Sequence, residues 1–446
     1  MPRVAVKKEP VKAKPRQKKA NGYKFPEKLP KGEVLKDTAK KEWILGSSIG
    51  QGGFGEIYCA SAADVKSSND PYVIKIEPHE NGPLFVEKNF YIKIARPDDV
   101  EKWKKEKNIK ILGIPTFHGS GSHEYKGEKY RFIVIERYGD DLWSLFLKNK
   151  RKFPPAVVYK CAIQIIDVLQ YIHEKGYVHG DIKGANLLLG LRKGTENNVF
   201  LVDFGLACKY KVDNEFKIDP KKAHNGTIEY TCRDWHMGVP TRRGDMEILG
   251  FNLLHWLCST LPWEGDIKNP EKVFEKKRAL MENVKEHMKT KFPDVPKVIA
   301  QYLSYVGSLN HDETPDYEFC KEMFIKELKT LPGSTNGKLD FNSESGSKTN
   351  STPKNIKRKS RVSIVHKEEL EESDSDNDLF VTPSPKKYKG KTKKNTPIPI
   401  PEEIPVEKST PKKRTRKDAA PKPSWRDAPT AQGSNISKAG EYVKKR

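Results

Sequence analysis

The pattern of apolar and polar residues predicts a strand-rich segment followed by a helical one. Four short stretches have the apolar alternation of strands: WILGSSIG (43–50), EIYCAS (56–61), YVIKIE (72–77) and YRFIVIERY (130–138). Further along, PAVVYKCAIQIIDVLQYIHEK (155–175) has apolar residues at helical spacing, and DMEILGFNLLHWLCSTLPW (245–263) is apolar nearly all round, as a buried helix is. We therefore expect two lobes, each with its own hydrophobic core.

Both ends of the chain lack this periodicity. Residues 1–40 are basic and contain proline, and residues 331–446 are rich in Ser, Thr, Pro, Lys and Glu. Such segments bury too little apolar surface to offset the conformational entropy lost on ordering. We therefore expect a basic disordered arm over 1–40, a folded domain over 41–330 and a disordered tail over 331–446.

Charge and cysteine content narrow the class of protein. The 446 residues carry 83 Lys and Arg against 60 Asp and Glu, and this net charge of +23 favours anionic partners such as nucleic acid or acidic protein surfaces. The six cysteines are scattered without a C-x-x-C pair, which indicates reduced thiols in an intracellular protein. The N-terminus has no apolar signal-peptide core, and no apolar run predicts a membrane span.

A glycine pattern, G-x-G-x-x-G, lies between the first two predicted strands and is filled by Gly50, Gly52 and Gly55. A dinucleotide-binding fold would place a helix after these glycines, and a P-loop would need G-x-x-x-x-G-K-[ST], so both are disfavoured. A glycine hairpin followed by an apolar residue, here Ile57, is typical of the nucleotide lid of a kinase, where backbone N–H groups approach phosphate oxygens. An ordinary glycine turn remains the alternative at this point.

A lysine and a carboxylate accompany this hairpin. Lys75 lies on the strand that follows and can reach the α- and β-phosphates of a nucleotide. Glu87, on the next predicted helix, is placed to orient it. A single lysine is usually a solvated surface charge. The Lys75–Glu87 pair therefore indicates nucleotide binding only in combination with the motifs that follow.

Two further motifs follow the long predicted helix. In HGDIKGAN (179–186), Asp181 can accept or orient the proton of a substrate hydroxyl, Lys183 can neutralise charge on the γ-phosphate and Asn186 can hold Mg²⁺. In FLVDFG (200–205), an apolar strand ends in Asp203, the expected second metal ligand. Phosphoryl transfer requires charge neutralisation, in-line positioning and a group that orients the nucleophile, and these motifs supply all three in order.

Together these motifs resemble those of the eukaryotic protein kinase superfamily over about residues 43–330, and within it the chain is similar to the vaccinia-related kinases, relatives of casein kinase 1. The finer resemblance rests on NGPLF before Glu87, HGDIKGANLLL, GTIEYT, RRGDMEILG and the absence of an A-P-E triplet, where TCRDWH (231–236) stands. It implies an α+β, two-lobed kinase fold with a small antiparallel-sheet N-lobe containing one helix and a larger helical C-lobe, with ATP between the lobes.

The resemblance assigns roles to further residues. It implies that ATP is bound by Ile49, Gly50, Gly52, Gly55, Ile57, Lys75, Glu87, Ile135, Glu136, Tyr138 and Asp203. In this set Ile135 is the gatekeeper and Glu136–Tyr138 the adenine-binding hinge. Mg²⁺ is held by Asn186 and Asp203, and Asp245 is the buried aspartate that braces the catalytic loop. Lys183 and Thr227 match the serine/threonine kinase pattern.

Two departures accompany the resemblance. Gly180 stands where an arginine usually precedes the catalytic aspartate and pairs with a phosphorylated activation loop. We therefore expect activity that does not depend on such phosphorylation. The missing A-P-E triplet removes the usual glutamate anchor of that segment, a loss that the related families share.

The resemblance implies a serine/threonine kinase of nuclear, chromatin-associated proteins such as histones and barrier-to-autointegration factor, acting in mitosis, meiosis and nuclear-envelope dynamics. It predicts localisation in the nucleus on chromatin, and in the cytoplasm during division. Basic clusters in the tail, such as KKRTRK (412–417), are candidates for nuclear import and for contact with DNA or nucleosomes. The alternative is a catalytically weak pseudokinase scaffold on chromatin, which the presence of Lys75, Asp181, Asn186 and Asp203 disfavours.

Overall fold

A six-stranded antiparallel sheet forms the N-terminal lobe in the computed structural model, which describes residues 26–51, 55–65, 70–210, 215–332 and 337–341. The strand order is β1-β2-β3-β4-β6-β5. The strands are β1 (Val34–Lys36), β2 (Glu42–Gln51), β3 (Glu56–Ala62), β4 (Tyr72–Pro78), β5 (Phe117–Tyr125) and β6 (Glu128–Glu136). The four strands predicted from apolar alternation are confirmed as β2, β3, β4 and β6, and the glycine segment joins β2 and β3 as a hairpin.

Two helices follow the first four strands. The expected helix that carries Glu87 is α1 (Pro83–Ile94), which begins with proline and buries Leu84 and Phe90. A second helix, α2 (Pro97–Glu106), was not predicted, because Trp103 is its only buried residue and most of the others are charged. The indole of Trp103 donates to Glu174 Oε2 at 2.6 Å and so ties α2 to the C-terminal lobe.

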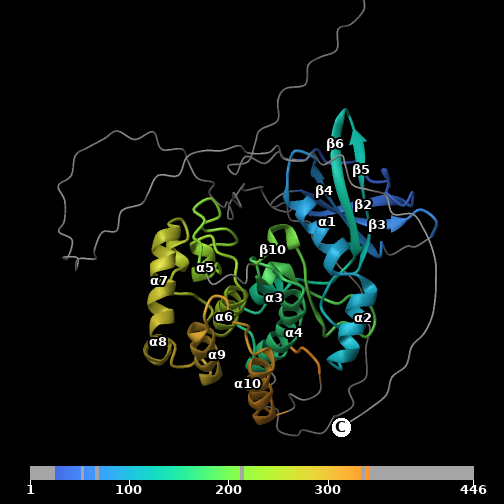
Figure 1. The fold of residues 1–446 in the computed structure, drawn as a ribbon. Coiled ribbons are helices and arrows are strands. Elements are labelled where there is room, and N and C mark those ends of the chain that lie inside the picture. Colours follow the sequence, from blue (N-terminus) through green and yellow to red (C-terminus); the bar gives the residue numbers. More distant parts are fainter. Residues whose placement is uncertain (1–25, 52–54, 66–69, 211–214, 333–336, 342–446) are drawn as a thin grey trace, which may run out of the picture. The chain divides into compact units, whose positions relative to one another are not determined.

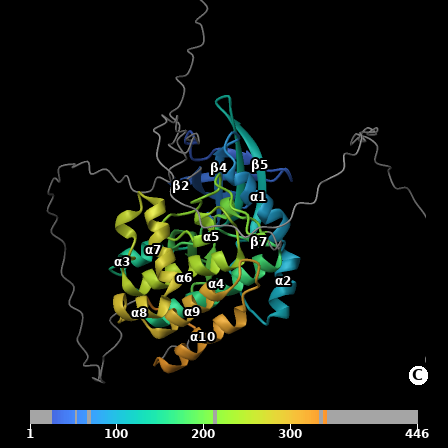
Figure 2. The same ribbon diagram turned by 60° about the vertical axis from the view of Figure 1, so that its left-hand side comes forward.

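The remaining described chain is mainly helical (Figures 1 and 2). Its helices are α3 (Leu142–Lys148), α4 (Pro155–Glu174), α5 (Arg233–His236), α6 (Arg242–Cys258), α7 (Pro270–Glu282), α8 (Val284–Lys291), α9 (Lys297–Ser308) and α10 (Tyr317–Thr330). Its short strands, β7 (Tyr177–Val178), β8 (Leu187–Leu189), β9 (Val199–Leu201) and β10 (Cys208–Lys209), form two antiparallel pairs, β7 with β10 and β8 with β9. These pairs carry the loops on which the catalytic motifs lie.

The two long apolar segments are both helices, with different limits from those expected. Helix α6 begins earlier, at Arg242, because the Thr241 side chain accepts from Gly244 N as an N-cap. It ends at Cys258, since Ser259 has a left-handed backbone (φ 70°). By length and hydropathy α4 alone among the described helices resembles a membrane span, but 67% of that window is buried inside the protein.

The sequence predicted a separate hydrophobic core for each lobe, but in the structure one core extends across both lobes. One cluster covers the outer face of the N-lobe sheet and includes Leu35, Trp43 and Tyr130. The larger cluster continues from α1 into the C-lobe helices. At the junction Phe90 of α1 stacks on Phe204, with ring centroids 3.9 Å apart. The lobes therefore share apolar packing beneath the candidate site.

The ordered part of the chain extends beyond the predicted limits of 41–330. Leu35 lies in β1 and is fully buried, so the expected disordered arm over 1–40 does not reach its predicted end. Beyond residue 330, Leu339 N donates to Asn197 Oδ1 at 2.7 Å, and Phe341 contacts the Phe153 ring with centroids 5.1 Å apart. The apolar residues in this part of the chain are few and follow no helical or strand periodicity. The composition of the segment therefore did not reveal that it contacts the folded domain.

Close packing at Gly113 supports the strand that leads to Asp203. Gly113 O accepts from Leu201 N of β9 at 2.9 Å, and a Cβ added at Gly113 would lie 2.0 Å from Val199 O. We predict that Gly113→Ala lowers the free energy of unfolding by about 1–3 kcal/mol, as overpacking typically does. Urea denaturation measures this loss. Gly265→Ala is the matched control, since a Cβ there meets nothing within 4 Å; an equal loss in both variants would contradict the prediction.

Candidate active site

The glycine hairpin lies above β4, which carries Lys75. Gly52 lies outside the described residues. A Cβ at Gly55 would stand 2.1 Å from Ile76 O, so only glycine allows this approach of β3 to β4. Ile49 at the end of β2 is 50% exposed. Ile57 of β3 stands directly opposite Lys75 in the β3–β4 register, so the hairpin and the lysine have a fixed relation.

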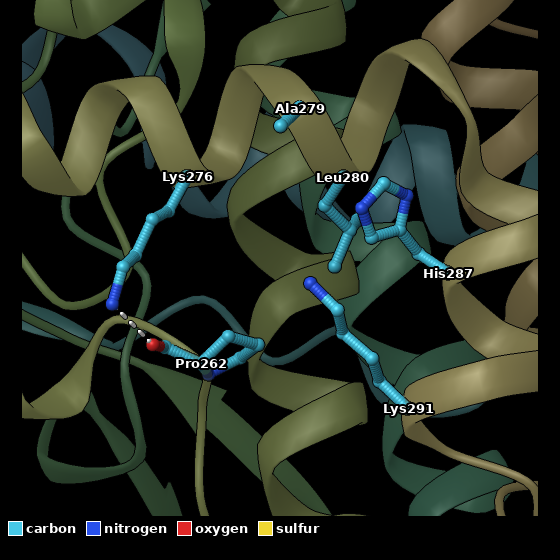
Figure 3. Close-up of a pocket in the computed structure, with 6 residues that line it drawn as sticks. All are labelled: Pro262, Lys276, Ala279, Leu280, His287 and Lys291. Carbon is cyan, nitrogen blue, oxygen red and sulfur yellow. Dashed lines mark hydrogen bonds between the residues drawn. The ribbon is translucent and has the colours of Figure 1, made fainter.

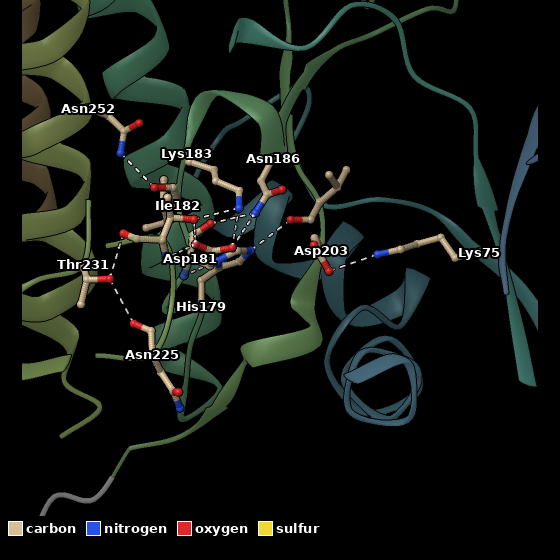
Figure 4. Close-up of polar contacts among 12 residues, drawn as sticks. Lys75, His179, Asp181, Ile182, Lys183, Asn186, Asp203, Asn225, Thr231 and Asn252 are labelled. Carbon is tan, nitrogen blue, oxygen red and sulfur yellow. Dashed lines mark hydrogen bonds and ion pairs between the residues drawn. The ribbon is translucent and has the colours of Figure 1, made fainter. Parts of the chain in front are cut away.

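Lys75 joins three elements through two ion pairs. Its Nζ lies 2.6 Å from Glu87 Oε2 on α1. It lies 3.1 Å from Asp203 Oδ1 after β9, a contact that Figure 4 shows. Burial alone would lower the pKa of Lys75, but the carboxylates of Asp203 and Glu87 outweigh it and raise that pKa. Burial likewise opposes ionisation of Asp203, yet Lys75 and Lys183 hold its pKa below the ordinary value. Burial raises the pKa of Glu87, while the neighbouring ammonium group of Lys75 lowers it. The ion pairs thus stabilise the charged forms of Lys75 and Asp203.

The expected hinge residues lie at the end of β6 and just after it. Ile135 is buried, and Glu136 N donates to Thr116 O at 3.0 Å. The Tyr138 ring stacks on Phe200 with centroids 4.4 Å apart, and its hydroxyl accepts from Thr116 N at 3.2 Å. The Tyr138 side chain is thus engaged within the fold, so a ligand at this segment would meet its backbone.

Asp181 is the centre of a compact polar cluster (Figure 4). Its Oδ1 accepts from Thr227 N at 2.9 Å and from Thr227 Oγ1 at 2.7 Å. Lys183 Nζ lies 3.0 Å from Asp181 Oδ2 and donates to Thr227 Oγ1 at 2.8 Å. Burial would lower the pKa of Lys183, but Asp181 reverses that effect and raises it. The Asn186 amide donates to Asp181 O at 2.8 Å, which turns its Oδ1 outward as a potential ligand.

Asp245 of α6 holds the loop that presents this cluster. Its carboxylate is completely buried and accepts from His179 N at 2.7 Å and from Gly180 N at 2.9 Å. His173 Nε2 contacts the same carboxylate at 3.0 Å, and His173 Nδ1 contacts the Tyr317 hydroxyl at 2.8 Å. The backbone of the loop is therefore fixed to two helices, α6 and α4.

Sequence reasoning missed several of these supporting residues. His173 and Tyr317 extend the contacts of Asp245 to α4 and α10. Asn252 Nδ2 donates to Ile182 O at 2.9 Å and so holds the loop next to Asp181 (Figure 4). The available signal for Asn252 was its polar side chain, which is flanked on both sides by apolar residues in the segment 245–263. Nothing local to Tyr317 indicated its partner.

Two backbone conformations in the site are unusual. Asp203 has a left-handed backbone (φ 66°, ψ 67°), which is uncommon for residues other than glycine, asparagine and aspartate. Gly180 has φ 78°, and a Cβ there would lie 3.0 Å from the Trp235 ring. Gly180, which stands in place of the usual arginine, therefore has a backbone conformation that favours glycine and an indole ring next to it.

The segment after Thr231 is anchored although it lacks A-P-E. Asp234 accepts a forked pair of hydrogen bonds from Arg243 Nε and Nη2, each 2.8 Å long. Arg233 Nε donates to Glu247 Oε2 at 2.9 Å. Both partners lie on α6, so two buried ion pairs fix the end of this segment.

The side chains fit a nucleotide and a divalent cation. Lys75 offers an ammonium group, which can bind phosphate oxygens, beside the carboxylate of Asp203, which can bind a metal. Asp203 and Asn186 supply oxygen donors, the ligand type that Mg²⁺ prefers. Gly55, where a side chain would clash with the next strand, permits the close backbone approach that a phosphate lid needs.

Two other features lie apart from these residues. A hollow of about 170 Å³ lies beside α7 and α8 and is lined by Pro262, Lys276, Ala279, Leu280, His287 and Lys291 (Figure 3). Ligand atoms of Glu229, His255 and Glu264 lie within 4.8 Å of one another. Arg151 contacts both His255 and Glu264 and already supplies a cation to that group.

A family model described as the protein kinase domain matches residues 43–332. Nucleosomal histone kinase 1 of Drosophila melanogaster is 49% identical over 348 residues, which cover 76% of this chain and 58% of that protein. Serine/threonine-protein kinase VRK2 of Homo sapiens is 41% identical over 346 residues, which cover 76% of this chain and 66% of that protein.

A solved structure of vaccinia related kinase 3 shares this fold. It aligns with a TM-score of 0.61 at 28% identity and covers 68% of this chain and 92% of that one. The aligned part of this chain spans less than two thirds of the length of nucleosomal histone kinase 1 and of VRK2. The predicted fold class, a two-lobed kinase fold with one sheet-rich and one helical lobe, is confirmed.

The contact between Gly180 and Trp235 yields a prediction. Gly180→Ala combines left-handed strain, which costs roughly 1–2 kcal/mol, with displacement of the indole. Gly176→Ala is the matched control, because Gly176 has φ 82° and no atom within 4 Å of an added Cβ. We expect a lower thermal midpoint for Gly180→Ala than for Gly176→Ala. Equal midpoints would mean that the Trp235 ring moves aside at no cost.

Proposed function

Because the chain belongs to the protein kinase family, and within it to the vaccinia-related kinases, we propose that it is a serine/threonine protein kinase. It would transfer the γ-phosphate of ATP to hydroxyl groups of nuclear, chromatin-associated proteins. The observation that carries this proposal is the cluster in which Asp181, Lys183 and Thr227 are joined by hydrogen bonds of 2.7–3.0 Å.

Asp181 is the proposed proton acceptor. Its Oδ1 is held by Thr227 and its Oδ2 by Lys183, so the carboxylate has one orientation toward an incoming hydroxyl. A carboxylate in this position orients the nucleophile and accepts its proton as the phosphoryl group transfers. Lys183, beside it, would offset negative charge on the transferring phosphoryl oxygens.

Lys75, Glu87, Asn186 and Asp203 form the proposed nucleotide and metal group. Glu87 orients Lys75 toward the α- and β-phosphates, and Asn186 and Asp203 would hold Mg²⁺. When bound, Mg²⁺ neutralises the charge of the phosphate oxygens. The hairpin residues Ile49, Gly50, Gly52, Gly55 and Ile57 would cover the nucleotide, and Ile135, Glu136 and Tyr138 would border the adenine.

The proposed substrates are histones first. One relative, at 49% identity, is a nucleosomal histone kinase by name, and this supports a chromatin substrate for the present chain. Barrier-to-autointegration factor, action in mitosis or meiosis and contact of the basic tail with DNA are finer proposals from the family resemblance. The basic cluster of the tail at residues 412–417 lies outside the described part of the chain.

The first experiment measures phosphate transfer from ATP and Mg²⁺ to mixed histones and to barrier-to-autointegration factor. We expect labelled serine or threonine with the wild type. Asp181→Ala and Lys75→Met should each lower the rate by about 10²–10⁴-fold, since each removes a positioned charged group from the reaction.

Lys93→Met is the matched control, because Lys93 lies exposed on α1. It should transfer phosphate at the wild-type rate. A folded wild type that binds nucleotide but transfers no phosphate would favour the alternative, a pseudokinase scaffold on chromatin.

Gly180 leads to a second prediction for this function. With no arginine before Asp181, a phosphate on the activation segment has no partner there, and the Thr231 hydroxyl already donates to Asn225 O and Thr227 O. We expect protein treated with a phosphatase, and then freed of it, to keep its activity toward histones. Loss of activity that returns only with phosphate on Thr227 or Thr231 would contradict this.

A further inference from the structure

The turn that holds Asp181 is itself held from below by two side chains. Lys277 Nζ of α7 donates to Ile228 O and to Thr231 O, each at 2.7 Å. Trp263 Nε1 donates to the carbonyl between them, Glu229 O, also at 2.7 Å. Three carbonyl groups of residues 228–231 thus receive donors from outside the segment.

Lys277 is an unusual residue for this place. It is fully buried, with its ammonium group 5.4 Å from the Phe251 ring and 5.2 Å from the Trp263 ring. Burial lowers the pKa of this lysine to about 7, against the effects of Cys232, Glu247 and Glu229, which raise it. An apolar side chain would pack here without that cost, so the specific contribution of lysine is its N–H donors.

The turn connects these donors directly to Asp181. Tyr230 N and Thr231 N both donate to Thr227 O at 2.8 Å, so residues 227–231 form one closed turn. Thr227 N and Oγ1 then contact Asp181 Oδ1. A shift at the Thr231 carbonyl therefore moves the group that orients Asp181.

We propose that Lys277, with Trp263, is a positioning residue that fixes the 227–231 turn for phosphoryl transfer to a protein substrate. The inference rests on the proposed kinase function and adds a residue to it. The Asp234–Arg243 and Arg233–Glu247 pairs fix only the far end of the segment, beyond Thr231. Lys277 acts nearer to Asp181, where it holds the turn in one geometry.

The test compares two adjacent lysines of α7. Lys277→Met keeps the length and apolar packing of the side chain but removes its donors. Lys276→Met is the control, because Lys276 contacts other residues than the 227–231 turn: it donates to Pro262 O at 3.0 Å (Figure 3) and pairs with Asp266. Lys277→Arg is a third variant that restores N–H donors.

The readouts are steady-state kinetics with histone and ATP varied separately, and hydrogen exchange of backbone amides in the full chain. We expect Lys277→Met to lower kcat/KM for histone by about tenfold or more, as a displaced positioning group does, with an unchanged KM for ATP. The Thr227 amide should exchange faster, while the Arg233 amide, which donates to Glu247 at 2.8 Å, should not. Lys276→Met should match the wild type, and Lys277→Arg should recover part of the loss.

Two results would overturn the proposal. One is transfer by Lys277→Met at a rate within about twofold of the wild type, which would be smaller than the effect of a positioning group. The other is slowed transfer with an unchanged Thr227 amide. If Lys277→Met does not fold, Lys277→Arg is compared with the wild type instead. Similar exchange of the Thr227 amide and a similar transfer rate in these two proteins would then support the proposal. A wild type that transfers no phosphate would instead refute the kinase function, and hydrogen exchange would still report on the turn.

Discussion

A single buried carboxylate, that of Asp245, sets the geometry on which the proposed active site depends. A charge removed from water must be compensated by hydrogen bonds, and the donors here are the backbone N–H groups of His179 and Gly180 together with the His173 ring. The two backbone donors belong to the loop immediately before Asp181, so the hydrogen bonds that compensate the charge of Asp245 also place the proposed proton acceptor. The loop cannot shift without breaking these two hydrogen bonds.

The nucleotide side of the site depends on a different kind of connection. Lys75 comes from the sheet, Glu87 from α1 and Asp203 from the loop after β9, and their two ion pairs cross the junction of the lobes. Beneath them Phe90 and Phe204 stack, so apolar packing sets the distance across which these charges meet. The position of α1 thus determines both contacts at once.

The sequence predicted much of this arrangement and left out a definable part. Strand alternation located β2, β3, β4 and β6, and Lys75, Asp181 and Asp203 were recognised from short motifs, because each motif is local in the chain. The contacts of Tyr317 and Lys277 join residues far apart in sequence, and no local pattern encodes such a partner. Helix α2 was missed because only Trp103 buries an apolar side chain there, and Leu35 because a three-residue strand has no period to detect.

The backbone at Gly180 has a consequence for how the proposed kinase activity could come under control. In its left-handed conformation, with the Trp235 indole 3.0 Å from an added Cβ, the position disfavours any side chain. An arginine could arise by mutation, but it would meet both the strained backbone and the indole. Control through a phosphorylated activation segment therefore carries a structural cost at this position. In a lineage that keeps this loop, regulation is gained more easily at another position.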